Sequence, residues 1–153
     1  MRKKTALVVL GAAIAGVLGL APTAQASTSC TSPNADDKVC LFQNAPATDG
    51  GVVRIDVYSR PSWVPLQYDN SSHYLYAGDG VLTNVSAAIN WDLNSRVAFY
   101  YNSNYYGPCF TVAAGGQIGS FARIVLTNGR SANDNMNSHH FNRTCGTVYN
   151  FGY

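Results

Sequence analysis

Few side chains in this sequence can do chemistry: four cysteines, three histidines and eight acidic residues, all of them aspartate. His139 and His140 are adjacent, and neighbouring residues of a strand point to opposite faces, so the two cannot readily share a site. The sequence contains no nucleophile elbow, zinc-peptidase histidine pair or phosphate-binding glycine loop. We therefore expect a protein that is not an enzyme and needs no cofactor.

The cysteines indicate disulfide chemistry instead. Cys30, Cys40, Cys109 and Cys145 are too far apart in sequence to form the close pairs of a zinc site. Four cysteines allow three pairings, and sequence alone does not choose among them. We favour Cys30–Cys40, which closes a short loop near the start of the mature chain, and Cys109–Cys145, which ties the middle of the chain to its C-terminal part.

The N-terminal stretch 1–26 has the pattern of a secretory signal peptide. Residues 2–4 are basic, residues 6–21 are apolar, and residues 24–26 read Ala-Gln-Ala, a small-x-small cleavage site. The apolar run is shorter than a comfortable membrane span and is followed by Pro22. We predict a signal peptide at 1–26, a secreted, extracellular protein, and no membrane association after cleavage.

Cleavage would change the charge of the protein. Of the 10 Lys and Arg residues three lie in the signal, so seven remain against eight aspartates, a net charge of −1. This charge excludes the basic surface that nucleic acids or anionic membranes require. The length of the mature chain fits one domain. We predict a polar lead-in at 27–37 and a single domain at 38–153, which we expect to be a monomer.

Short strands separated by Gly, Asn and Pro dominate the rest of the chain. The predicted strands are 38–42, 51–59, 96–102, 108–116 and 122–127, with one or two more in 139–153; residues 62–80 form a long connection and 81–95 a turn or short helix. No apolar face recurs at helical spacing for long enough to make a sizeable helix. A faint repeat with a period of 43 relates residues 90–95 to 133–138. Together these patterns predict an all-β sandwich of two Greek-key motifs.

The stretch YYNSNYYGPCF (100–110) predicts an aromatic hairpin. We expect Asn and Ser at 102–104 to form the turn, where Asn tolerates left-handed dihedrals. Tyr105 would then fold against Tyr100, and Gly107 would leave room for the ring. Cys109 would lock the hairpin from the next strand.

These residues resemble a βγ-crystallin Greek-key motif, in which Y-x-x-x-x-Y-x-G is followed further along the chain by an N-D-x-x-[ST]-S loop. The loop NDNMNS (133–138) fits all positions except Asn137, and NWDLNS (90–95) fits less well. Over residues 30–145 the chain is also similar to secreted inhibitors of the Streptomyces metalloproteinase inhibitor family, through Cys30, the CLF of 40–42 and the Tyr100–Cys109 hairpin. The resemblance implies a βγ-crystallin-like fold and inhibition of an extracellular protease.

A substrate-like inhibitor needs an exposed, rigid segment, and a disulfide beside the presented bond supplies the rigidity. Thermolysin-type metalloproteases favour a bulky apolar residue after the cut bond, so one candidate for the inhibitory loop is Cys109–Phe110. Another is the connection 62–80, with Trp63, Val64, Leu66 and Tyr68. The alternative for Phe110 is an ordinary core position in a strand.

Two other functions fit the pattern. Loops of this kind can hold Ca²⁺ through hard oxygen ligands. One candidate set is Asn133, Asp134, Asn135 and Asn137, and another is Asn90, Asp92 and Asn94. Each loop carries one carboxylate, so weak affinity is expected, and the same side chains could instead cap turns. The many Tyr and Asn residues also suit a cell-surface or polysaccharide-binding module.

Overall fold

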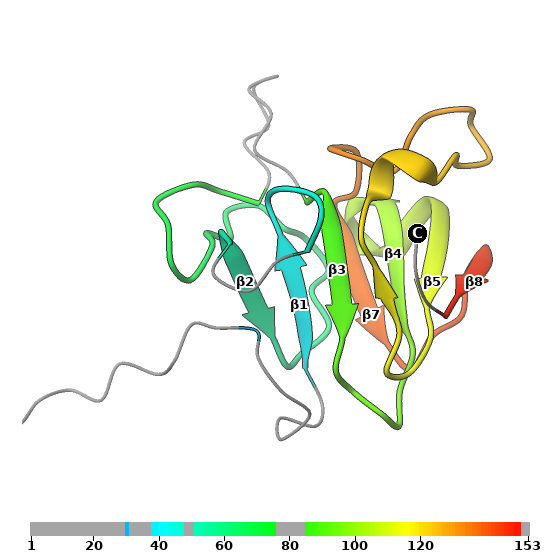
Figure 1. Cartoon of the computed structure of the whole chain (residues 1–153). Coiled ribbons are helices and arrows are strands. Elements are labelled where there is room, and N and C mark those ends of the chain that lie inside the picture. Colours follow the sequence, from blue (N-terminus) through cyan, green and yellow to red (C-terminus); the bar gives the residue numbers. More distant parts are fainter. Residues whose placement is uncertain (1–29, 31–37, 48–50, 76–84, 151–153) are drawn as a thin grey trace, which may run out of the picture.

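The computed structural model describes residue 30 and residues 38–47, 51–75 and 85–150. The predicted signal peptide (1–26) lies outside the described residues, as does the lead-in (27–37) except for Cys30. Within the described part, eight strands form two four-stranded sheets, and the remaining regular structure is two single-turn 3₁₀ segments, η1 (Ser103–Tyr105) and η2 (Phe121–Arg123). The all-β prediction is confirmed (Figure 1).

The first sheet has the order β2-β1-β3-β6 and the second the order β7-β4-β5-β8. The strands of the first sheet are β1 (Val39–Phe42), β2 (Val53–Asp56), β3 (Ala87–Asn90) and β6 (Gln117–Ile118); those of the second are β4 (Val97–Asn102), β5 (Tyr106–Val112), β7 (Ser138–Phe141) and β8 (Thr147–Tyr149). All pairs are antiparallel except β5 and β8, which run parallel.

Each half of the chain contributes one segment to the sheet of the other half. β6 follows β5 in sequence, yet it pairs with β3 in the first sheet through Ala88 and Ile118. The crossing segment (residues 57–63) follows β2 but reaches the second sheet, where Arg60 bridges to His139 of β7. Each sheet thus combines three strands of one motif with a contribution from the other, as the Greek-key prediction requires, and the second sheet has β8 in addition.

The core lies between the sheets and is rich in aromatic rings. Phe99 of β4 stacks on Phe110 of β5 with ring centroids 5.1 Å apart, and Phe121 and Trp63 meet Phe99 edge-on. All four side chains are at most 1% exposed. Because complete burial of one such side chain stabilises by roughly 1.5–3 kcal/mol, this cluster supplies much of the force that holds the sheets together.

A smaller cluster covers the outer face of the first sheet. Strand β1 alternates, with Val39 and Leu41 in the main core and Cys40 and Phe42 in the second cluster with Cys30. Trp91 packs against it and donates its indole N–H to the sulfur of Cys30 at 3.1 Å. Both faces of β1 are therefore buried, which explains its unbroken apolar sequence.

Two predicted elements differ from the structure, and the short strand β6 was not predicted. The stretch 81–95 contains strand β3 rather than a turn or short helix. Three of its four residues, two Ala and one Asn, have little strand propensity, and pairing with β1 and β6 decides its conformation. The predicted strand 122–127 is the 3₁₀ turn η2 followed by one bridge, Val125–Ser131. Its buried Ile124 and Leu126 alternate with Val125, which is 72% exposed, so the pattern is strand-like although no ladder forms.

Candidate functional site

The structure contains two disulfides, Cys30–Cys40 and Cys109–Cys145, the pairing favoured among the three. Their sequence separations are 10 and 36. The second bridge joins β5 to the segment that precedes β8, so it fastens the C-terminal part of the chain to the middle of the second sheet.

The bond Cys109–Phe110 is not placed for presentation to a protease. Phe110 is 1% exposed, lies opposite Phe99 in the β4–β5 ladder and packs in the core. A protease could not take this ring into its cleft unless the sheet opened. Phe110 is therefore a core residue of a strand, which was the alternative to an inhibitory role.

The second candidate, the connection 62–80, is only partly exposed. Trp63 and Tyr68 are buried, Leu66 is half-buried and Val64 is 48% exposed. Residues 76–80 lie outside the described residues. The two aromatic side chains that made this connection attractive therefore belong to the core cluster.

A different segment combines exposure with rigidity. We call residues 142–148 the anchored segment; all of them are exposed except Cys145, which is half-buried. The backbone N–H of Asn142 donates to the carbonyl of Arg96 at 2.9 Å, and the Arg96 guanidinium donates to the hydroxyl of Thr144 at 2.9 Å. The segment was missed because its residues are short and polar, although Cys145 marked its attachment point.

Thr111 and Gly146 hold the same segment close to β5. The Thr111 hydroxyl accepts the backbone N–H of Cys145 at 2.8 Å and donates to its carbonyl at 2.7 Å. At Gly146 the backbone has φ +60° and a Cβ would lie 2.1 Å from the carbonyl oxygen of Cys109. Only glycine allows this approach. The anchored segment is thus joined to β5 by a disulfide, a side-chain clamp and a backbone contact.

The tyrosine hairpin adjoins the anchored segment, and Tyr105 folds against Tyr100 as predicted. The prediction for Gly107 was wrong in one respect, because the side chain of Asn102, not a tyrosine ring, lies against this glycine. The rings of Tyr100 and Tyr105 pack edge-on with centroids 5.8 Å apart, and the turn places Asn104 at φ 59° and Gly107 at φ 84°. The ring of Tyr105 also packs on His140 at 4.7 Å. The tyrosines therefore pin the turn, and they continue into a surface cluster with β7.

The two predicted calcium loops are not equivalent in the structure. Residues 133–138 lead into β7, whereas residues 90–95 follow β3, so the period of 43 does not relate matching positions. In the first motif Phe42 of β1 pairs with Ala87 of β3, and in the second Tyr100 of β4 pairs with Ser138 of β7. The start of β3 therefore corresponds to the start of β7. The residues before β3 are thus the structural counterpart of 133–138. The repeat was wrong because Asn and Ser are common in both kinds of loop.

The loop 90–95 uses its polar atoms to close itself. One oxygen of Asp92 accepts the backbone N–H groups of Asn94 and Ser95, each at 2.8 Å, and Asp92 is 3% exposed. Asn90 donates to the carbonyls of Ser95 and Ala113. These side chains act as turn caps, which was the alternative to cation binding.

In the loop 133–138 the side-chain amide of Asn133 donates to one carboxylate oxygen of Asp134 at 2.5 Å. Asp134 has φ 55° and its carboxylate accepts the Ser86 hydroxyl at 3.5 Å, so the loops before β3 and before β7 meet here. Burial raises the pKa of Asp134 above its ordinary 3.8, against the hydrogen bond from Ser86. The side-chain oxygen of Asn137 is buried and has no hydrogen-bond partner within the described residues. Asn135, by contrast, donates to the carbonyls of Ser131 and Asn133.

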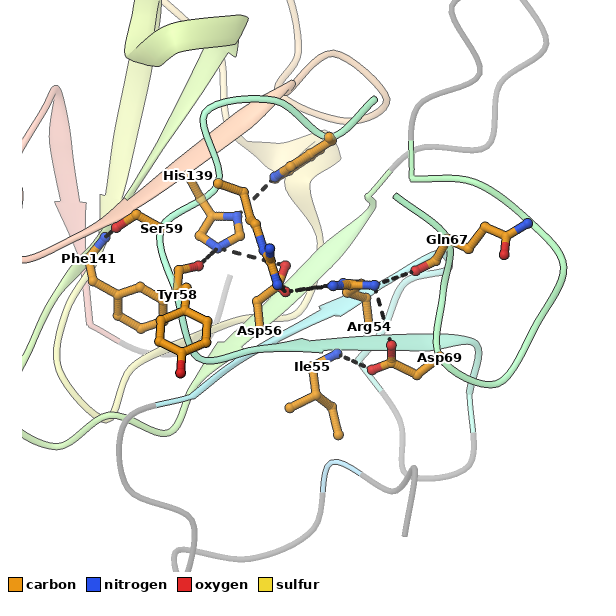
Figure 2. A network of polar contacts seen from close by, with 11 residues as sticks. Arg54, Ile55, Asp56, Tyr58, Ser59, Gln67, Asp69, His139 and Phe141 are labelled. Carbon is orange, nitrogen blue, oxygen red and sulfur yellow. Dashed lines mark hydrogen bonds and ion pairs between the residues drawn. The ribbon is translucent and has the colours of Figure 1, made fainter. Parts of the chain in front are cut away.

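The strongest electrostatic cluster is buried where the crossing segment passes between the sheets (Figure 2). One carboxylate oxygen of Asp56 accepts from Arg54 at 2.8 Å and from Arg60 at 2.8 Å. Its other oxygen lies 3.9 Å from Nε2 of His139 and has no hydrogen-bond partner in the described part of the chain. Burial would raise the pKa of Asp56, but the arginines and the His139 ring hold it below its ordinary value.

His139 is uncharged at neutral pH. The Trp63 indole N–H donates to Nδ1 at 2.9 Å, so Nε2 carries the proton and donates to the carbonyl of Tyr58 at 3.1 Å. Complete burial lowers the pKa of His139 to about 4, although Asp56 opposes the effect. Asp56 lies on β2 and His139 on β7, so the cluster joins the two sheets. Because both side chains are fully buried, a substrate has no access to them.

Within the described residues, no three or more His, Cys or Asp side chains gather as a metal centre. The same residues contain no helix long and apolar enough to cross a bilayer.

Several solved structures match this fold. One comes from work on the evolution of the eye lens βγ-crystallin domain fold. It has a TM-score of 0.50 and 13% identity, covering 76% of this chain and 94% of that chain. A βγ-crystallin from Ciona intestinalis has a TM-score of 0.43 and 14% identity, covering 67% and 96% of the two chains. An archaeal βγ-crystallin has a TM-score of 0.42 and 15% identity, covering 69% and 98%.

No protein-family model matches the chain, and no curated protein matches it either. The protein is thus a βγ-crystallin-like sandwich, as the resemblance implied, and at these identities the likeness establishes the fold alone. The comparisons do not bear on the peptidase-inhibitor family.

Proposed function

We propose that this chain is a secreted, monomeric inhibitor of an extracellular peptidase that works without a cofactor or chemistry of its own. The observation that supports the proposal is the anchored segment, residues 142–148, exposed at the surface and joined to β5 by the Cys109–Cys145 bridge. The two disulfides also suit an extracellular protein, since such bridges persist in oxidising compartments.

Rigidity is what a substrate-like inhibitor needs. A flexible peptide loses conformational entropy when a peptidase orders it, whereas a pre-ordered segment avoids much of that loss. Here the segment is fixed at Asn142 and Thr144 through Arg96, and at Cys145 through Cys109 and Thr111. A peptidase would therefore meet a backbone that is already in one conformation.

Inhibition assays on the oxidised chain without residues 1–26 test the proposal. The sequence resemblance favours a metallopeptidase, so thermolysin stands first, with subtilisin and trypsin beside it. The double variant Cys109→Ser/Cys145→Ser should weaken inhibition by about 10-fold or more, because the segment loses its anchor. The control Cys30→Ser/Cys40→Ser removes a bridge on the other sheet and should retain inhibition. No inhibition of any of the three enzymes at micromolar protein would refute the function.

Calcium binding is a second candidate, and the meeting of Ser86 with Asp134 favours it. Carboxylate, hydroxyl and amide oxygens are the ligands that Ca²⁺ takes, and Ser86, Asp134 and Asn137 would supply them. A cation that binds only the folded state must raise the melting temperature. We expect millimolar Ca²⁺ to raise it, Asp134→Asn to abolish the effect and Asp92→Asn to leave it in place. An identical melting curve with and without Ca²⁺ would exclude this site.

A further inference from the structure

Arg143 is the one charged residue in the sequence of the anchored segment. Residues 143–145 are in neither a helix nor a turn, and they lie between two left-handed residues, Asn142 at φ 60° and Gly146 at φ 60°. Arg143 is exposed at the start of this stretch. The bond that follows it, Arg143–Thr144, joins two exposed residues and lies between the fixed points Asn142 and Cys145.

The side chain of Arg143 is ordered but not paired with an acid. Its guanidinium carbon lies 5.7 Å from the centroid of the Tyr105 ring, in a cation–π contact. Tyr105 is itself held by Tyr100 and His140. Within the described residues Arg143 takes part in no ion pair, in contrast to Arg54 and Arg60, whose guanidinium groups bind Asp56. Its charge is thus available to an acidic partner.

We infer that the peptidase is a trypsin-type serine peptidase, and that Arg143 enters its specificity pocket; this inference rests on the proposed function. Such a pocket carries a carboxylate at its base and selects Arg or Lys before the cut bond. The charge of the pocket complements that of Arg143, and the tyrosine hairpin that orders the arginine reduces the side-chain entropy lost on binding.

The anchors on both sides of the Arg143–Thr144 bond would also limit the damage from cleavage. Hydrolysis adds one water, which leaves a carboxylate on Arg143 and an amine on Thr144. The piece that begins at Thr144 stays attached through the Cys109–Cys145 bridge and the pairing of β8 with β5. The new ends would therefore remain close together, so release is slow and the bond can reform. A free peptide of the same sequence has neither property.

The segment suits a metallopeptidase less well. Of the apolar side chains considered for that class, the bulkiest, Phe110, Trp63 and Tyr68, are buried. Leu66 is half-buried, and the exposed Val64 is a smaller side chain with no disulfide beside it. The exposed apolar residue of the anchored segment is Val148, and its backbone is already paired in β8 with Thr111 of β5. A peptidase would have to displace β8 to bind an extended chain across the bond before Val148.

Inhibition constants against trypsin, thermolysin, subtilisin and chymotrypsin test the inference. We expect the oxidised chain to inhibit trypsin, and Arg143→Ala to weaken this roughly 100-fold, the loss typical of a central interface residue. Arg143→Lys should stay within about 10-fold of the wild type, because the pocket accepts Lys. Arg143→Leu should no longer inhibit trypsin and should inhibit chymotrypsin instead, a change that a purely structural role would not cause. The control Arg130→Ala removes another exposed arginine, on a different loop, and should change nothing.

The outcomes separate this inference from the function on which it rests. Equal inhibition of trypsin by wild type and Arg143→Ala would overturn the inference, as would inhibition of thermolysin or subtilisin alone, and both leave the inhibitor function standing. Inhibition of no enzyme overturns both. After long incubation with trypsin, reduction and mass spectrometry should show cleavage after residue 143; a first cut elsewhere would contradict the assignment.

Discussion

The free energy of unfolding of the sandwich should fall as the pH is lowered from 6.5 toward 4, because the folded protein keeps His139 unprotonated over this range. The folded protein holds this side chain neutral, with Nδ1 accepting from Trp63 and Nε2 donating to Tyr58. A second proton would have to replace the hydrogen bond from the indole in a fully buried site. The unfolded chain has no such restriction and takes up the proton at the ordinary pKa of 6.5.

The size of the effect follows from the two pKa values of His139. The folded pKa of about 4 lies below the unfolded 6.5, so between them the unfolded state binds more protons. The stability contribution is complete above pH 6.5 and is lost as the pH falls toward 4. The full difference amounts to about 3 kcal/mol, of which about 2 kcal/mol should disappear between pH 7 and pH 4.5. Asp56 faces His139 and has a lowered pKa, so its own contribution is lost at still lower pH, below 3.8.

Urea unfolding followed by tryptophan fluorescence, with both disulfides intact, measures this loss. In His139→Gln the amide can still accept from Trp63 and donate to Tyr58, but it does not titrate, so its stability should change much less between pH 7 and pH 4.5. His140→Gln lies on the same strand and should keep the wild-type loss. A wild-type free energy of unfolding that stays constant over this range, or an equal loss in His139→Gln, would refute the reasoning.

Two further predictions concern how the anchored segment is held. Gly146→Ala should lower the free energy of unfolding by roughly 2–5 kcal/mol, from the left-handed backbone and the clash with the Cys109 carbonyl; Gly129→Ala, with φ +77° and open space around it, should cost only about 1–2 kcal/mol. Equal losses in thermal melts would show that the close approach is unimportant. Removing Cys109–Cys145, with a separation of 36, should cost about 4 kcal/mol, against about 3 kcal/mol for Cys30–Cys40, with a separation of 10; urea titration of the two double serine variants checks the order, and the reverse order would contradict the loop-entropy argument.

Local signals in the sequence predicted the fold well. Short β-rich runs identified β1, β2, β4, β5 and the C-terminal strands, and the spacing from Tyr100 to Gly107 predicted the hairpin because turn geometry depends on neighbouring residues. β3 was missed, since its Ala-Ala-Ile core becomes a strand only through pairing with distant β1 and β6. For residues 122–127 a strand was predicted but did not form. Their alternating pattern is strand-like, yet apart from the bridge Val125–Ser131 no strand among the described residues pairs with them.

The candidate site was harder to predict than the fold. An inhibitory bond was sought beside Cys109 because that cysteine adjoins a bulky ring, yet burial depends on the opposite sheet, which the sequence does not show. The exposed residues lie beside the other half of the same disulfide, at Cys145. The buried contact of Asp56 with His139 joins residues 83 positions apart (139 minus 56), and no local pattern predicts such a pair.

The exchange of strands between the sheets has a consequence for how the molecule can be divided. A fragment that ends after β3 would lack β6, and one that begins at β4 would lack the crossing segment with Arg60. Each fragment would therefore expose an open sheet edge and its own part of the aromatic core, so neither should persist alone, while a mixture of both should reassemble. In concentrated refolding mixtures the same open edges would let two chains trade halves, with the hinge at the β3–β4 connection.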